Sequence, residues 1–226
     1  VPVGGRGLIA VSAIAATSLK PGVYIYGVQS ELYPSMLDAL HGAAPARHPT
    51  AQTVAEGIAV KSPGALTVPI VQALAADILI AREEAIEHAL ALILEIAKTL
   101  VEGAAAAALA ALLAHPARFA GKNVGLVMSG GNIDMRLLSN LILRELVRED
   151  RILSLTVELV DRPGQLALVA ALVGGAGGNI LEVAHNRMMD GTPLKSARLG
   201  LVIEARDAAH AGEIRSKLQA GGFKLA

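Results

Sequence analysis

Hydrophobic positions in the first 150 residues form short runs and longer blocks, separated by loops rich in glycine, proline and polar residues. The short runs are apolar almost throughout, which predicts strands buried on both faces. They lie at residues 1–3, 23–28, 77–81 and 123–128. The longer blocks predict helices at residues 8–18, 33–40, 68–75, 83–100, 104–114 and 135–147. Strands and helices alternating in this way are typical of a parallel α/β sheet.

The pattern changes after Asp150. Residues 153–160 (LSLTVELV) alternate between apolar and polar, which predicts a strand with one buried face. Further elements are predicted as a helix at 166–173, strands at 180–186 and 198–205, a helix at 208–220 and a short strand at 223–226. This β-α-β-β-α-β order is the ferredoxin-like plan. We therefore expect two domains, residues 1–150 and residues 151–226.

Composition excludes several classes of protein. Twenty basic residues balance twenty acidic ones, so no nucleic-acid partner is expected. The absence of cysteine excludes disulfides and thiolate metal sites, and the six histidines have no metal-ligand spacing, so no metal is expected. The apolar run 104–114 is shorter than the about 20 residues that cross a bilayer. We expect a cytoplasmic protein without a membrane partner.

A glycine-rich loop, Gly4-Gly5-Arg6-Gly7, lies between a predicted strand and a predicted helix. Backbone N–H groups at such a helix start suit a phosphate. Residues 5–10 (GRGLIA) match the dinucleotide pattern G-x-G-x-x-A, and Glu31 follows the next strand, as an acid that holds a ribose would. A nicotinamide-dependent oxidoreductase is therefore one alternative, and a glycine turn needed only for packing is another.

A second strand–loop–helix unit favours a different cofactor. The stretch MSGGNID places Ser129 after the predicted strand 123–128, at the edge where parallel sheets bind their ligands. A hydroxyl there can hydrogen-bond a pyridine nitrogen, as pyridoxal phosphate would require. After the strand 23–28, the polar residues Gln29, Glu31 and Asp38 are interpreted as a solvated loop rather than a cation site.

Four stretches in order resemble the threonine ammonia-lyases, which have the tryptophan-synthase-β-like fold (fold type II): VPVGGRGLIA, TVAEGIAVKSPGALT, KTLVEGAAAAALAALL and LVMSGGNID. The resemblance covers residues 1–150. Through DRPGQL and GGNILEVAHNR, residues 151–226 resemble the ACT regulatory domain of such enzymes. The family's loop usually has four consecutive glycines, and here Arg6 replaces the third.

The resemblance implies pyridoxal 5'-phosphate as cofactor and assigns roles to individual residues. The cofactor phosphate would be bound by the backbone N–H groups of Gly4, Gly5, Arg6, Gly7 and Leu8. Ser129 would meet the pyridine nitrogen. Gly57, within Glu56-Gly57, would pass beside the ring, and Glu102-Gly103 would lie nearby.

The ACT resemblance implies an amino-acid effector site in the second domain. Its candidates are Asp161, Gly164, Asn179 and Ile180, with N–H groups at a helix start binding the effector's carboxylate. A structural turn, in a domain that serves only oligomer contacts, is the alternative. A homo-oligomer is expected in either case.

The family's Schiff-base lysine has no counterpart here, because Lys20, Lys61, Lys98 and Lys122 all lack its sequence context. The chain therefore contains no catalytic residue of its own and is expected to be inactive alone, as the C-terminal part of a lyase. The activity implied is deamination of L-threonine to 2-oxobutanoate and ammonia, with L-serine giving pyruvate as a side reaction. A non-catalytic, amino-acid-binding regulatory remnant is the alternative.

Overall fold

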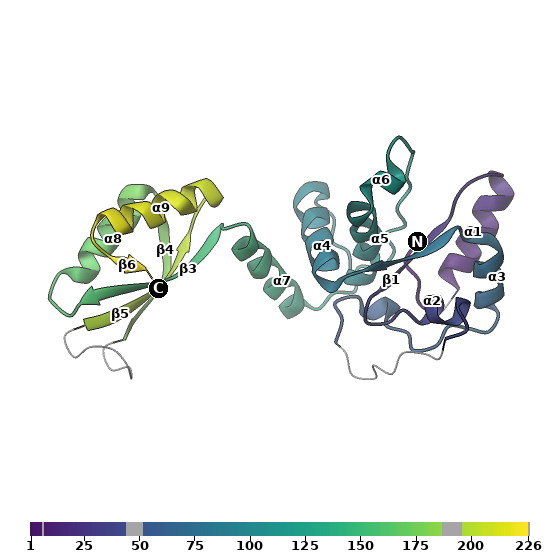
Figure 1. The fold of residues 1–226 in the computed structure, drawn as a ribbon, viewed down its shortest axis with the longest axis horizontal. Helices are drawn as coiled ribbons and strands as arrows, with labels where there is room; N and C mark the ends of the chain where they lie inside the picture. The colour runs from purple at the N-terminus through teal and green to yellow at the C-terminus, as the bar shows by residue number, and fades with distance from the viewer. Residues whose placement is uncertain (6, 44–51, 187–195, 226) are drawn as a thin grey trace. The chain divides into compact units, whose positions relative to one another are not determined.

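The computed structural model describes residues 1–5, 7–43, 52–186 and 196–225 (Figure 1). The chain divides into two compact units, Val1–Leu138 and Ser139–Ala226. The division thus falls inside helix α7 (Met135–Arg148), about twelve residues before the boundary expected near Asp150. Asp150 has a φ of 55° and lies in a turn between α7 and the first strand of the second unit.

A small parallel sheet lies at the centre of the first unit. Strand β1 (Tyr26–Ser30) pairs with β2 (Asp77–Ala81), from Tyr26 opposite Asp77 to Ser30 opposite Ala81. Pro2 forms a single parallel bridge to Val28 on the other side of β1. The parallel arrangement predicted from the sequence is confirmed. The first predicted strand, however, forms only this one bridge.

Helices cover both faces of this sheet (Figure 1). They are α1 (Leu8–Leu19), α2 (Ser35–Leu40), α3 (Thr67–Leu74), α4 (Glu83–Ala97), α5 (Gly103–Ala114) and α6 (Pro116–Phe119), with a short 3-10 turn η1 (Glu56–Ile58). The first three helices enclose a core around Val3, Ile9, Met36 and Ile78. Helix α5 packs on β1, β2 and α4 and is buried over most of its length, because alanine methyl groups allow close approach. None of the helices in the described ranges is long and apolar enough to cross a membrane.

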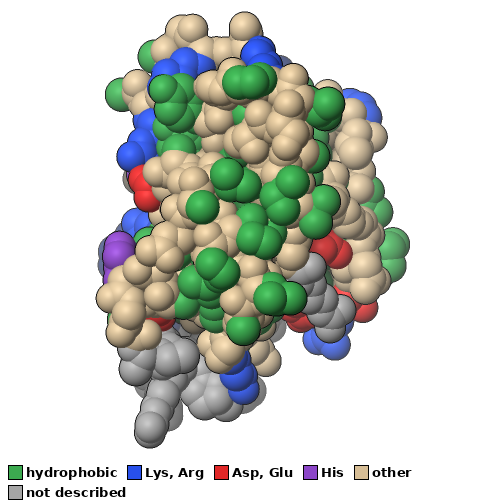
Figure 2. Space-filling view, turned by 90° about the vertical axis from the view of Figure 1, so that its right-hand side faces the viewer, with side chains coloured by type: hydrophobic (Ala, Val, Ile, Leu, Met, Phe, Trp, Pro, Cys, Tyr) green, Lys and Arg blue, Asp and Glu red, His purple; other side chains and the backbone are tan. Residues whose placement is uncertain are grey.

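One side of the first unit carries exposed apolar side chains. Helix α1 has no charged residue, and Leu8, Val11 and Ile14 are 43%, 67% and 46% exposed. Figure 2 views the side on which α1 and α3 lie, and apolar side chains gather over it. Helix α1 is therefore buried on one side only, at Ile9, Ala10 and Ala13.

Two predictions for the first unit are wrong. Residues 123–128 form neither strand nor helix, and Val124 and Met128 are 40% and 43% exposed. An apolar run becomes a strand only where a neighbour accepts its hydrogen bonds, and neither described strand of this sheet pairs with it. Gln29 is fully buried rather than solvated, because its Oε1 accepts the N–H groups of Met36 and Leu37 at 3.0 and 3.1 Å.

The second unit has the β-α-β-β-α-β order that its alternating pattern predicts. Its elements are β3 (Ile152–Val160), α8 (Gln165–Ala176), β4 (Asn179–Asn186), β5 (Ser196–Glu204), α9 (Ala208–Ala220) and β6 (Lys224–Leu225). The antiparallel sheet has the order β4-β5-β3-β6. One face is buried by alternate residues of β3 and β5, such as Val157 and Leu201, against Val173 of α8 and Ile214 of α9.

A buried histidine joins the two helices of this unit. The Nδ1 atom of His210 accepts the N–H of Arg206 at 3.1 Å, so Nε2 carries the proton and donates to the carbonyl of Ala176 at 2.9 Å. We expect His210→Ala to lower the free energy of unfolding of the second unit by about 1–3 kcal/mol, since these backbone groups lose their partner. Native-state hydrogen exchange in α8 and α9 measures this change. His185→Ala, on an exposed position of β4, is the control; equal effects of the two variants would contradict the prediction.

Candidate functional site

The start of helix α1 is open to a ligand. Gly7 precedes the helix with a φ of 92°, and no side chain caps the first turn. The first N–H groups of a helix have no partner within it, and the helix dipole makes this end positive. The backbone here can therefore bind an anion such as a phosphate. Arg6 lies outside the described residues.

Gly4 and Gly5 lie directly against η1 and the residues that follow it. A Cβ on Gly5 would lie 2.7 Å from Cγ1 of Val60, and one on Gly4 would lie 3.2 Å from the carbonyl oxygen of Gly57. Glycine at both positions thus lets the loop before α1 approach residues 57–60 closely. We call the groups around this contact, Gly4, Gly5, Gly7, Leu8, Gly57 and Val60, the glycine cradle.

Glu102 links the glycine cradle to the segment that contains Ser129. A Cβ on Gly57 would lie 2.7 Å from Oε1 of Glu102, and one on Gly130 would lie 2.6 Å from the same oxygen. The N–H of Glu102 donates to the carbonyl of Gly130 at 3.2 Å. The structure therefore brings together three regions that are distant in the sequence, around residues 4–8, 57 and 129–130.

Ser129 differs in its setting from the sequence prediction. It does not follow a strand, because residues 121–134 contain no described helix or strand. Gly130, the next residue, has a φ of 98°. The Ser129 side chain is exposed, so the contact of its neighbour Gly130 with Glu102, rather than a sheet edge, positions it near the cradle.

The effector candidates of the second unit fall into two separate groups. Gly164 precedes α8 with a φ of 89°, and Asp161 lies in the turn after β3. Asn179 and Ile180 begin β4, opposite Glu204 and Ile203 of β5. Because Ile152, at the start of β3, also pairs with Glu204, the two groups lie at opposite ends of β3, about 26 Å apart at about 3.3 Å per residue. The four candidates therefore do not form a single cluster within one chain, and their role as effector contacts stays a prediction.

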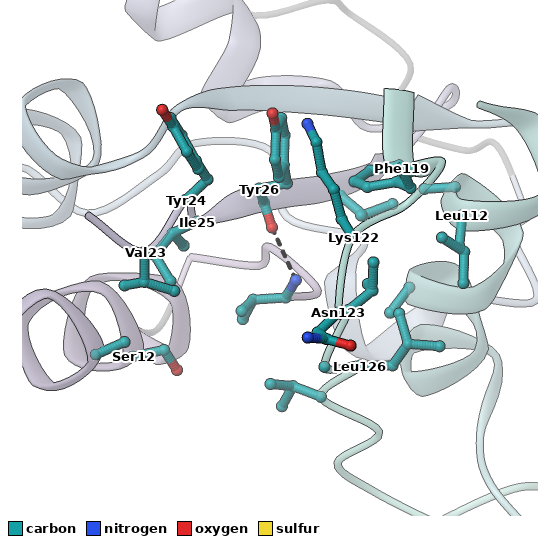
Figure 3. A pocket seen from close by; sticks show the side chains of 18 of the residues that line it. Ser12, Val23, Tyr24, Ile25, Tyr26, Leu112, Phe119, Lys122, Asn123 and Leu126 are labelled. Carbon is teal, nitrogen blue, oxygen red and sulfur yellow. Dashed lines mark hydrogen bonds between the residues drawn. The ribbon is translucent and has the colours of Figure 1, made fainter. Parts of the chain in front are cut away.

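The first unit also has an apolar pocket of about 600 Å³ (Figure 3). Its lining includes Ser12 of α1, Tyr26 of β1, Leu112 of α5 and Lys122. Tyr26 stacks edge-on against Phe119, with ring centroids 5.3 Å apart. None of the cradle glycines lines this pocket, so the pocket and the cradle are separate features.

Sequence reasoning missed a carboxylate behind the cradle. Glu83, at the start of α4, accepts hydrogen bonds from Ser30 and Thr53, both at 2.6 Å, and from the N–H of Val54 at 2.9 Å. An acid in the first turn of a predicted helix is common, so the residue type alone gave no signal. Among the described residues, no three acidic or histidine side chains gather as a metal site would require.

The glycine cradle fits the phosphate of a cofactor. A bound phosphate needs several N–H donors and room for close approach of the backbone, and glycines at the tight contacts together with an uncapped helix start provide both. Comparison with known proteins identifies the cofactor. The family described as pyridoxal-phosphate dependent enzyme matches residues 1–130.

Individual relatives point the same way. The chain is 38% identical over 225 residues to an L-threonine ammonia-lyase of Thermotoga maritima, covering 100% of this chain and 56% of the relative. It is 40% identical over 224 residues to an L-threonine ammonia-lyase of Geobacter sulfurreducens, covering 99% of this chain and 56% of that protein. The chain thus spans about half the length of these curated relatives.

A solved structure adds the fold. The crystal structure of a T.th. threonine deaminase superposes with a TM-score of 0.56 and 35% identity, covering 59% of this chain and 49% of that one. The order of the matched segments, the glycine cradle and these similarities agree. The chain belongs to the family of pyridoxal-phosphate dependent enzymes, whose cofactor is pyridoxal 5'-phosphate.

Proposed function

We propose that this chain is part of an enzyme that deaminates L-threonine to 2-oxobutanoate and ammonia, and L-serine to pyruvate more slowly. The observation that carries the proposal is the identity of 38% and 40% to two L-threonine ammonia-lyases along nearly the whole chain. Because this similarity includes the second unit, it supports a specific match rather than the general family fold.

Each part of the cradle has a role in this proposal. The N–H groups of Gly4, Gly5, Gly7 and Leu8 bind the cofactor phosphate, and the Ser129 hydroxyl hydrogen-bonds the pyridine nitrogen. Gly57 leaves room beside the ring, since a side chain there would contact Glu102. Bound pyridoxal phosphate supplies the electron sink that stabilises negative charge at the substrate α-carbon. The chain's own residues hold and orient that group.

We further propose that the second unit is an ACT regulatory domain that binds an amino acid, in a homo-oligomeric enzyme. Its β-α-β-β-α-β order and the uncapped start of α8 after Gly164 support this assignment. Asp161 and Gly164 then form one contact region. Asn179 and Ile180 form a separate one.

A chimera tests the threonine assignment. The segment of the Thermotoga maritima relative that has no counterpart here is joined to this chain, because none of this chain's lysines has the context of the family's Schiff-base lysine. With pyridoxal phosphate and L-threonine, the chimera is expected to form 2-oxobutanoate, and the 226-residue chain alone is expected to form none. A chimera that acts on another amino acid but not on threonine would overturn the substrate assignment.

Ser129→Ala in the same chimera should weaken cofactor binding and slow turnover. Loss of one neutral hydrogen bond to the ring corresponds to about a threefold to tenfold rise in the dissociation constant. Fluorescence titration with pyridoxal phosphate measures it. Ser18→Ala, at the exposed end of α1 that lies away from the cradle, serves as control. An unchanged affinity in Ser129→Ala would remove Ser129 from the site.

A further inference from the structure

The segment behind the glycine cradle is fixed by one carboxylate. Oε1 of Glu83 accepts the hydroxyl groups of Ser30 and Thr53, and its Oε2 accepts the N–H of Val54. Ser30 is fully buried and Thr53 is 8% exposed. Hydrogen bonds to an ionised carboxylate are stronger than neutral ones, so this group joins the end of β1 to the start of the segment 53–60.

The segment continues from this anchor to the cradle. Thr53 Oγ1 accepts the N–H of Ala55 at 3.0 Å, and Ala55 is fully buried. The carbonyl of Val54 lies so close to Gly103 that a Cβ there would be 2.1 Å away. Three residues later the chain reaches Gly57 and then Val60, the two residues that contact Gly4 and Gly5. The position of the cradle wall therefore depends on where residues 53–55 are held.

We propose that Glu83 is a positioning residue for the phosphate side of the cofactor site. It acts through Thr53 and Val54, which set the distance between residues 57–60 and the loop Gly4–Gly5. The inference rests on the proposed function, because it requires that the cradle binds the phosphate of pyridoxal phosphate. It adds a residue on α4 that does not itself touch the cofactor.

Binding of two ligands by the 226-residue chain tests this inference. Dissociation constants for pyridoxal phosphate and for pyridoxal, which lacks the phosphate, are measured by fluorescence. Glu83→Ala should raise the dissociation constant for pyridoxal phosphate by about tenfold, the equivalent of one lost charge-assisted hydrogen bond. The dissociation constant for pyridoxal should rise much less. The dissociation constant of Glu83→Gln for pyridoxal phosphate should lie between those of the unaltered chain and of Glu83→Ala, since the glutamine amide still offers one acceptor. Equal losses of affinity for both ligands would indicate a general loss of stability and would overturn the proposal.

Glu84→Ala is the matched control. Glu84 also lies in the first turn of α4 and is exposed, so its loss removes the same charge from the same helix end. This variant should bind both ligands like the unaltered chain.

Hydrogen exchange of residues 54–60 separates this inference from the proposed function. Exchange should rise in Glu83→Ala and stay unchanged in Glu84→Ala. If the unaltered chain binds no pyridoxal phosphate, the proposed cofactor role of the cradle fails. Unchanged exchange of residues 54–60 in Glu83→Ala would overturn the positioning role of Glu83, whether or not the chain binds pyridoxal phosphate.

Discussion

Replacing Gly103 by valine is expected to unfold the first unit. A Cβ at this position would lie 2.1 Å from the carbonyl oxygen of Val54 and 2.6 Å from its carbon. Both are backbone atoms, and Glu83 holds the Val54 N–H, so neither can move aside. Overpacking against fixed backbone should cost about 3 kcal/mol or more, which is a large part of the stability of a small unit.

Urea unfolding followed by hydrogen exchange in α4 and α5 measures this loss. Gly125→Ala provides the control, because a Cβ there meets nothing within 4 Å. The second unit, with its own core, should keep its protection in Gly103→Val. Protection of α5 that survives the substitution would show that residues 53–55 are not held as described.

Gly130→Ala should weaken pyridoxal phosphate binding by about tenfold to a hundredfold. The new Cβ would lie 2.6 Å from Oε1 of Glu102, and the φ of 98° strains any residue that has a Cβ. The Glu102 carboxylate is the end of a flexible side chain and can swing aside, but the strain of about 1–3 kcal/mol at the positive φ favours a shift of the segment 128–131, and Ser129 would shift with it. The dissociation constant from fluorescence titration of the chimera measures the effect.

Gly121→Ala distinguishes this displacement from backbone strain alone. Gly121 also has a positive φ, of 70°, but a Cβ there meets nothing within 4 Å. This variant should lose stability while keeping its affinity for pyridoxal phosphate. Similar losses of affinity in both variants would mean that the contact with Glu102 does not position Ser129.

Local patterns predicted the local features of this fold well. Strand β2 spans the predicted residues 77–81, and α9 spans the predicted residues 208–220. Strand β2 is a short, continuous apolar run, and α9 begins after Asp207, whose carboxylate accepts the N–H of His210. Alternation in residues 153–160 likewise predicted which side chains of β3 are buried.

Predictions that depended on distant partners failed or were not made. The run 123–128 has the composition of a strand, but composition does not provide a strand to pair with. The effector candidates were grouped by family resemblance, although the crossover through α8 makes β4 run parallel to β3. That direction places Asn179 level with the start of β3, on the other side of β5, and far from Gly164. The contacts of Glu83 span 53 and 30 residues of sequence and leave no local pattern.

The alanines of α5 have a consequence for how this protein can vary over evolutionary time. At most buried positions, shortening a side chain is the common way to damage a protein, because it leaves a void. In α5 the buried residues 104–108 are already alanine, so shortening them leaves almost no void. An Ala→Gly change there costs only about 1 kcal/mol of helix propensity. Enlargement is the damaging direction instead. Neutral drift in this helix is therefore one-sided, and lineages should exchange its residues for glycine or serine more readily than for valine or leucine.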